Sequence, residues 1–234
     1  MTLATAVAPL AAYALVFQTL IYMTLPAPMR TRVAPMVTGL VGAGLAFGAG
    51  LLFGFDSIGF TGADASIVTR WGLLTVLVVG LVGMAMMSRP AWRDQLADPR
   101  MASLGRRDSF IHIFIRIPVF TALIEEMVFR GVLHGALVVL YPTEVALWMG
   151  AGLFGLWHIG PGLDQAQAGD KRARSKLLHT AATVAGTTLA GAFLVWLRIE
   201  TGSIWASVAV HAAINMTMAL FARVAARQVE RHAA

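Results

Sequence analysis

Apolar windows long enough to cross a bilayer recur along this chain, and short polar or basic interruptions separate them. Crossing the hydrocarbon core takes about 20 consecutive apolar residues. The chain is 58% hydrophobic and 13% charged, whereas about a quarter of the residues of a soluble domain are charged. We therefore predict an all-α fold, a polytopic transmembrane bundle of about seven helices. The predicted spans lie near 4–25, 36–55, 71–87, 110–140, 144–158, 177–197 and 203–224.

We expect one membrane domain over residues 1–234, because the spans leave no room for a further soluble domain. Residues 1–107 would supply three spans, and residues 108–224 would supply four. The first 25 residues lack the positively charged leading segment of a signal peptide, so we interpret them as a retained first helix. The chain has no cysteine, which excludes disulfides, thiolate metal sites and a cysteine nucleophile.

Loop charges predict the orientation. Fourteen Lys and Arg residues follow spans one, three, five and seven, and only Arg70 and Arg198 lie in the other loops. Cytoplasmic loops carry the excess of positive charge. We therefore expect the N-terminus outside, the C-terminus in the cytoplasm and, from the Arg-rich and Lys-poor composition, a bacterial inner (plasma) membrane. The net charge of +6 then indicates contact with anionic lipid and not with nucleic acid.

Two of the predicted helices have unusual lengths. The window 110–140 would be about 45 Å long, and we interpret it as one helix kinked at Pro118. The window 144–158 would reach only about 22 Å before the Gly160-Pro161-Gly162 break. We expect its end to stop below the membrane surface and to leave His158 in a recess, followed by a mobile loop over 159–176.

Adjacent acids, Glu125 and Glu126, interrupt the apolar window 110–140. A carboxylate at bilayer depth costs about 2.5–3.5 kcal/mol on insertion scales, so the pair predicts a functional site within the membrane. Glu126 and Arg130 are four residues apart and can pair on one helix face. Glu125 points about 100° away, which leaves it for chemistry. The structural alternative is an ion pair between helices.

Further polar residues recur on later spans. Phe154 and His158 share a helix face, as do His211 and Asn215, because each pair is four residues apart. We expect Glu125, His158, His211 and Asn215 to converge on one cavity that opens to the cytoplasm. His134, another turn beyond Arg130, is interpreted as a packing residue. His112 and His179 are interpreted as interfacial residues.

These residue types form a hydrolytic set. A desolvated glutamate can act as a general base toward water, and a nearby histidine can orient that water. Histidine and asparagine donors on a facing helix could stabilise the oxyanion of a tetrahedral intermediate. The chain has neither a G-x-S-x-G nor an HExxH motif, so serine-hydrolase and zincin assignments lack their usual sequence support.

The three ordered motifs Glu125-Glu126-x-x-x-Arg130, Phe154-x-x-x-His158 and His211-x-x-x-Asn215 resemble those of the CPBP intramembrane proteases. That family comprises the CAAX prenyl endopeptidases and their bacterial relatives, which include proteins linked to bacteriocin processing and immunity. The resemblance covers roughly residues 110–220. It implies that Glu125 and His158 activate water, that His211 and Asn215 donate to the oxyanion, and that Glu126 and Arg130 support them.

Alternatives remain open from the sequence. Glu125, His158 and His211 could form a zinc site with an open water position, although we prefer a mechanism without a metal or other cofactor. An ion-coupled transporter would also use intramembrane Glu, Arg and His, but no duplicated halves are visible. A non-catalytic immunity or scaffold protein is a third possibility. The expected partners are membrane lipids and a membrane-associated peptide or protein substrate, whose binding residues the sequence does not identify.

Overall fold

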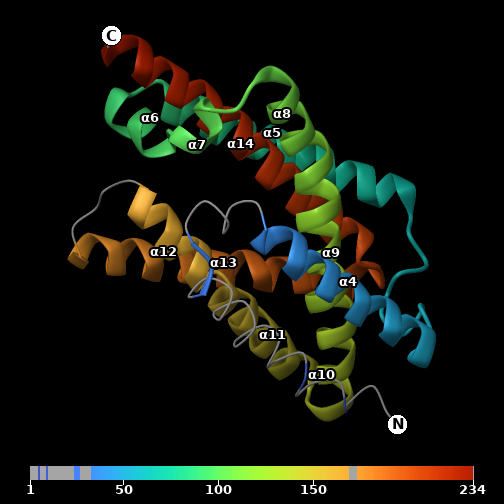
Figure 1. The fold of residues 1–234 in the computed structure, drawn as a ribbon. Helices are drawn as coiled ribbons and strands as arrows, with labels where there is room; N and C mark the ends of the chain where they lie inside the picture. Colours follow the sequence, from blue (N-terminus) through green and yellow to red (C-terminus); the bar gives the residue numbers. More distant parts are fainter. Residues whose placement is uncertain (1–4, 6–8, 10–23, 27–32, 169–172, 234) are drawn as a thin grey trace. The chain divides into compact units, whose positions relative to one another are not determined.

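The computed structural model describes residues 5, 9, 24–26, 33–168 and 173–233, which form helices and no strand (Figure 1). Within this part of the chain, four helices are long and apolar enough to cross a membrane: Met36–Phe53, Ala65–Met87, Ser175–Thr201 and Trp205–Arg231. The predictions of an all-α fold and of a multi-pass membrane protein are confirmed at this level. The count of seven spans stays a prediction, and most of the predicted first span, 4–25, lies outside the described residues.

The chain is helical without a break from Arg106 to Leu140, as the interpretation of one long helix requires. Its consecutive segments are α8 (Arg106–Ile111), η3 (His112–Leu123), α9 (Ile124–Glu126), η4 (Met127–Leu133) and α10 (His134–Leu140). The η segments are π-helical, and Pro118 lies inside η3. Wide π turns inside α-helices occur frequently at functional sites, and here they flank the two glutamates. The bend predicted at Pro118 stays a prediction.

The short fifth helix is confirmed, but the mobile loop predicted over 159–176 is wrong over 159–168 and 173–176, which are helical, while 169–172 lie outside the described residues. Helix α11 (Thr143–Trp157) has 15 residues and ends at His158. Helix α12 (Ile159–Ala168) follows at once, and α13 (Ala173–Thr201) begins soon after. Pro161 lies in the first turn of α12, where its missing N–H is not needed. A Cβ on Gly162 would lie 3.4 Å from the side chains of Thr180 and Thr183, so the glycine allows close packing on α13.

The stretch Ser88–Arg107, which the sequence presents as an interruption, also contains structure. Two short helices, α6 (Pro90–Leu96) and α7 (Pro99–Ala102), lie within it. Each begins with a proline, the residue favoured at the first helical position. Before them, α5 (Ala65–Met87) starts six residues earlier than the predicted span, because Asp64 caps it by accepting from the Ser66 and Ile67 amides.

The chain forms two compact units. The first comprises residues 1–63 and 124–207, and the second comprises residues 64–123 and 208–234. The first unit holds α4 (Ala34–Phe53) and the segments from α9 to α13, and the second holds α5 to α8, η3 and most of α14 (Trp205–Ala233). The prediction of a single membrane domain stays a prediction.

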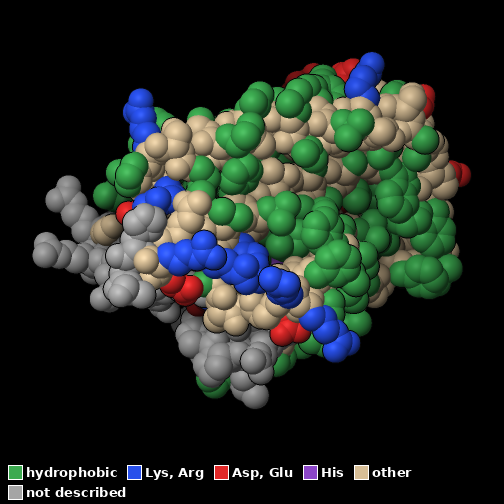
Figure 2. Space-filling model, turned by 90° about the horizontal axis from the view of Figure 1, so that it is seen from above, with side chains coloured by type: hydrophobic (Ala, Val, Ile, Leu, Met, Phe, Trp, Pro, Cys, Tyr) green, Lys and Arg blue, Asp and Glu red, His purple; other side chains and the backbone are tan. Residues whose placement is uncertain are grey.

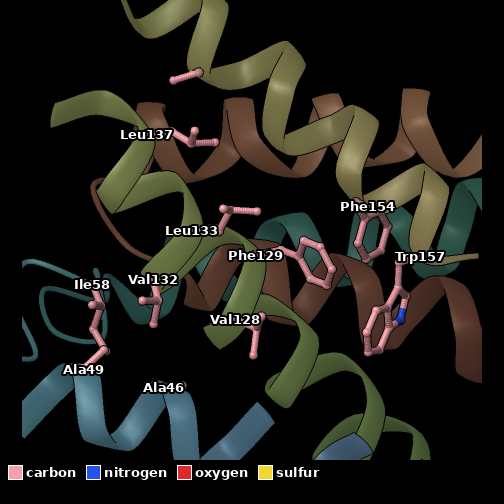
Figure 3. Close-up of a cluster of buried hydrophobic side chains, with 11 residues drawn as sticks. Ala46, Ala49, Ile58, Val128, Phe129, Val132, Leu133, Leu137, Phe154 and Trp157 are labelled. Atoms are coloured by element: carbon pink, nitrogen blue, oxygen red, sulfur yellow. The ribbon is translucent and has the colours of Figure 1, made fainter. Parts of the chain in front are cut away.

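The core of the first unit is a cluster of buried apolar side chains on α4, η4, α10 and α11 (Figure 3). Small residues let the helices approach closely. A Cβ on Gly155 of α11 would lie 2.9 Å from the Val184 carbonyl oxygen of α13. A Cβ on Gly131 of η4 would lie 3.0 Å from the Ile58 carbonyl oxygen. The segment that carries the glutamates is thus packed tightly by its neighbours.

Large apolar side chains remain exposed on the candidate spans, including Leu51 of α4, Leu73 of α5 and Leu189 of α13. Hydrophobic side chains also cover much of the face shown in Figure 2. In water such a surface would be unfavourable, since each exposed apolar Å² costs about 25 cal/mol. Against lipid chains it costs little, which fits a membrane protein.

Candidate active site

The two adjacent glutamates lie in different surroundings. Glu126 and Arg130 are both 0% exposed, and Glu126 Oε1 lies 3.0 Å from Arg130 Nη1. The ion pair predicted from the four-residue spacing is therefore present. Glu125, at the end of the same segment, is half-buried. The pair thus separates into a fully enclosed carboxylate held by an arginine and a half-buried neighbour, of which the oxygen Oε2 is also buried.

Arg130 joins three helical elements. Its Nη2 donates to the carbonyl oxygen of Gly191 on α13 at 3.3 Å. Its guanidinium carbon lies 4.0 Å from the ring centroid of Phe154 on α11. A desolvated cation–π contact contributes about 2 kcal/mol. Arg130 therefore fixes α11 and α13 relative to the segment that carries the glutamates.

Gly191 makes this arrangement possible. A Cβ at this position would lie 3.0 Å from Phe154 Cδ1 and 3.4 Å from Arg130 Nη2. Both neighbours are buried and closely packed, so neither could move without disturbing the ion pair. A side chain at position 191 would therefore push on Phe154 and Arg130, and each would have to give by a few tenths of an ångström.

The orientation of His158 is set by Phe154 in two ways. His158 Nδ1 lies 2.8 Å from the Phe154 carbonyl oxygen, and the two rings meet edge to face with centroids 4.6 Å apart. A carbonyl oxygen only accepts hydrogen bonds, so Nδ1 carries the proton and Nε2 carries the lone pair. In this tautomer Nε2 can accept a proton or bind a metal ion.

Phe129 and Trp157 form an aromatic cluster with Phe154. The Phe129 ring meets Phe154 at 5.1 Å and Trp157 at 5.7 Å between centroids, both edge to face (Figure 3). The spacing of Phe154 and His158 placed both on one helix face, but it carried no signal that Arg130 would stack on that ring. The contact of Phe154 with Arg130, and the close approach at Gly191, are thus features of the site that the sequence analysis did not predict.

His211 and Asn215 belong to the second unit. His211 is buried and Asn215 is half-buried, one turn apart on α14. Within that unit α14 packs closely on α5, where a Cβ at Gly83 would overlap the Phe221 ring, and Arg223 Nη1 donates to the Met101 carbonyl at 3.2 Å. Since Glu125 and His158 lie in the first unit, the convergence of all four residues on one cavity stays a prediction.

The zinc alternative needs Glu125, His158 and His211, which also come from both units. Their residue types fit a two-histidine, one-carboxylate site, and the tautomer of His158 fits a ligand. Among the described residues, no group of three or more His, Asp or Glu side chains is arranged to hold a metal ion. The zinc alternative therefore stays a prediction as well.

The predicted site residues lie within one segment that matches a known protein family. Residues 107–217 match a family model described as type II CAAX prenyl endopeptidase, Rce1-like. No curated protein and no solved structure matches the chain. The matched segment contains all six predicted site residues, namely Glu125, Glu126, Arg130, His158, His211 and Asn215.

Proposed function

Since residues 107–217 belong to the Rce1-like family of type II CAAX prenyl endopeptidases, we propose that this protein is an intramembrane endopeptidase. It hydrolyses peptide bonds of membrane-associated peptides or proteins with a water molecule activated by a glutamate. The observation that carries the assignment of the base is the contrast between the adjacent acids, because Glu126 is enclosed with Arg130 while Glu125 is half-buried.

In the proposed reaction, Glu125 takes a proton from water as the oxygen attacks the scissile carbonyl carbon. His158 Nε2 accepts a hydrogen bond from the same water and holds it in line. His211 and Asn215 donate to the oxyanion that forms. When the C–N bond breaks, the proton held by Glu125 passes to the leaving amine. The products are a free carboxylate and a free amine.

The residues Glu126, Arg130 and Phe154 act by holding the catalytic groups in position. Arg130 neutralises the buried Glu126 and lies on the Phe154 ring, and Phe154 orients His158 by its carbonyl and its ring. Holding catalytic groups in productive geometry is a large part of catalysis, since a displacement of about 1 Å can cost about 100-fold in rate. In the proposed topology the protein spans a bacterial inner membrane, with its N-terminus outside the cell membrane and its C-terminus in the cytoplasm.

The test compares Glu125→Gln with Glu144→Gln, an exposed control glutamate on α11. Membrane proteomes of a deletion strain complemented with each variant identify the substrate, and the purified variants are then assayed on it. Glu125→Gln should lose about 10²–10⁴-fold in rate with the folded yield intact, because the amide cannot accept the proton. Wild-type rates in both variants would contradict the proposal.

Two further measurements separate the alternatives. A scaffold or immunity protein would keep its phenotype in a Glu125→Ala strain, and a transporter would leave the membrane proteome uncleaved. A zinc enzyme would lose activity with chelator and regain it on zinc addition. The glutamate mechanism predicts a rate that chelator leaves unchanged at fixed pH.

A further inference from the structure

Arg198, in the last turn of α13, is a cation that the proposed reaction does not use. It is one of the two basic residues that the loop charges predict on the outer side, and the structure places both within helices, Arg198 in α13 and Arg70 in α5. The side chain is half-buried, and its Nε is buried without a hydrogen-bond partner. None of the carboxylates in the described ranges forms an ion pair with it. A partly buried guanidinium without a counter-charge is costly and calls for an explanation.

The loop between α4 and α5 holds the guanidinium in place. Gly59 in this loop has φ of +69°, and a Cβ there would overlap the Arg198 guanidinium. The Gly59 carbonyl accepts from the Ile204 amide at 2.9 Å, which ties the loop to the chain just beyond α13. Ile58, the preceding residue, is 0% exposed and packs into the core beside Val132 (Figure 3). Arg198 therefore lies against a fixed backbone surface.

A second polar group lies nearby. His134 of α10 is 6% exposed, and its Nδ1 has no hydrogen-bond partner within the described part of the chain. Gly131, three residues before His134, packs against this loop, because a Cβ there would lie 3.0 Å from the Ile58 carbonyl oxygen. The neighbours of His134 in sequence, Leu133 and Leu137, are fully buried and apolar. The region thus holds two hydrogen-bond donor groups, and no carboxylate of the described residues forms an ion pair with either.

The residues that the structure leaves undescribed contain few acids. Residues 1–32 contain no Asp or Glu. Among 169–172 and 234, the only acid is Asp170, which precedes the start of α13. Within the described residues no carboxylate pairs with Arg198, so the site is open to an anion from outside the chain.

We propose that Arg198, His134 and the Gly59 loop form a binding site for a phosphate group. Arg198 lies three residues before the end of the candidate span, about 4–5 Å along the helix axis. That depth matches the headgroup region, where the phosphate of an anionic phospholipid is found. A guanidinium binds phosphate through two parallel hydrogen bonds, and His134 supplies a further donor. The site does not depend on peptide hydrolysis.

The test measures binding to the full-length protein in neutral detergent. Native mass spectrometry and thermal unfolding are recorded with phosphatidylglycerol, with phosphatidylcholine and with inorganic phosphate. Wild-type protein should bind phosphatidylglycerol at least tenfold more tightly than phosphatidylcholine. Arg198→Gln should remove this preference, and Arg198→Lys should keep most of it. Arg70→Gln is the matched control, because Arg70 is an exposed arginine near the start of α5 and is the other basic residue predicted on the outer side.

Each outcome bears on the proposal. Phosphatidylglycerol bound by wild-type protein no better than phosphatidylcholine, with inorganic phosphate also without effect, would overturn it whether or not the variants fold. An equal loss in Arg70→Gln would overturn it too, because general surface charge would then account for binding. Competition by millimolar inorganic phosphate would identify a site for the phosphate group itself. Lipid binding without that competition would identify the headgroup in its bilayer setting as the ligand.

Discussion

Two arginine–carboxylate pairs, one in each compact unit, lie in opposite surroundings. Asp98 and Arg100 form the better geometry. Arg100 Nε donates to Oδ1 at 3.0 Å, Nη2 donates to Oδ2 at 2.8 Å, and the backbone amide of Arg100 donates to Oδ1 at 2.9 Å. These two side chains are 27% and 40% exposed. The pair of Glu126 and Arg130 has one oxygen at 3.0 Å and no exposure at all.

The comparison shows that the hydrogen-bond geometry of an ion pair does not determine how much the protein loses when the pair is broken. Water solvates Asp98 and Arg100 when they separate, so their pairing contributes little. Glu126 and Arg130 have no such alternative, because each would leave the other as an uncompensated buried charge. The buried pair also contacts two other helices, through Phe154 and Gly191.

The largest effect should come from removing one arginine of each pair. We expect Arg130→Ala to lower the free energy of unfolding by about 3–5 kcal/mol. Arg100→Ala should lower it by about 0–1 kcal/mol. The yield of monodisperse detergent-extracted protein and the melting temperature measure both. Equal losses would break the comparison.

Removing both partners of the buried pair should separate stability from position. The double variant Glu126→Leu, Arg130→Met should regain most of the stability that Arg130→Ala loses, since apolar replacements of buried pairs are often neutral. Its cleavage rate should stay up to about 100-fold below the wild-type rate, because the guanidinium no longer lies between Phe154 and Gly191. A double variant that recovers folding and rate together would show that the pair is only structural.

A smaller effect should distinguish two phenylalanines of the same cluster. Phe154→Leu and Phe129→Leu should each cost roughly 1–2 kcal/mol, less than truncation to alanine. Only Phe154 touches both Arg130 and His158. Phe154→Leu should therefore lower kcat by about tenfold, which is less than the loss of about 100-fold that a displacement of about 1 Å can cause. Phe129→Leu should leave kcat unchanged. Matched kcat values for the two variants would argue against positioning through Phe154.

The smallest effect concerns the exposed pair and pH. Burial alone would raise the pKa of Asp98, but the hydrogen bonds and charge of Arg100 outweigh it, and the pKa lies below the ordinary 3.8. The stabilisation is therefore fully present at neutral pH and is lost as pH falls through the lowered pKa. Asp98→Asn should lower the melting temperature slightly at pH 7, and this difference should shrink as pH falls below 3.8. A difference that grows on acidification would contradict the direction of the shift.

Local spacing predicted the parts of this protein that depend on local geometry. The four-residue separation gave the Glu126–Arg130 pair, and the length of the apolar window gave the short α11. The Gly160-Pro161-Gly162 run suggested a break, but proline in a first turn and a glycine against α13 also suit a helix, and tertiary packing decided for α12. The contacts of Arg130 with Phe154 and Gly191 join positions up to 61 residues apart, so periodicity along one helix could not reveal them.

The absence of a side chain at Gly191 has a consequence for genetics. A saturation screen of this chain should tolerate many substitutions along α13, most of whose neighbouring positions are at least partly exposed, and should reject every one at position 191, alanine included. An allele there would look like a harmless change between apolar residues, since no motif contains the position. Relatives that keep all three motifs but carry a larger residue in its place would be candidates for inactive descendants. The identity of the residue at position 191 should therefore distinguish active proteases from inactive homologues.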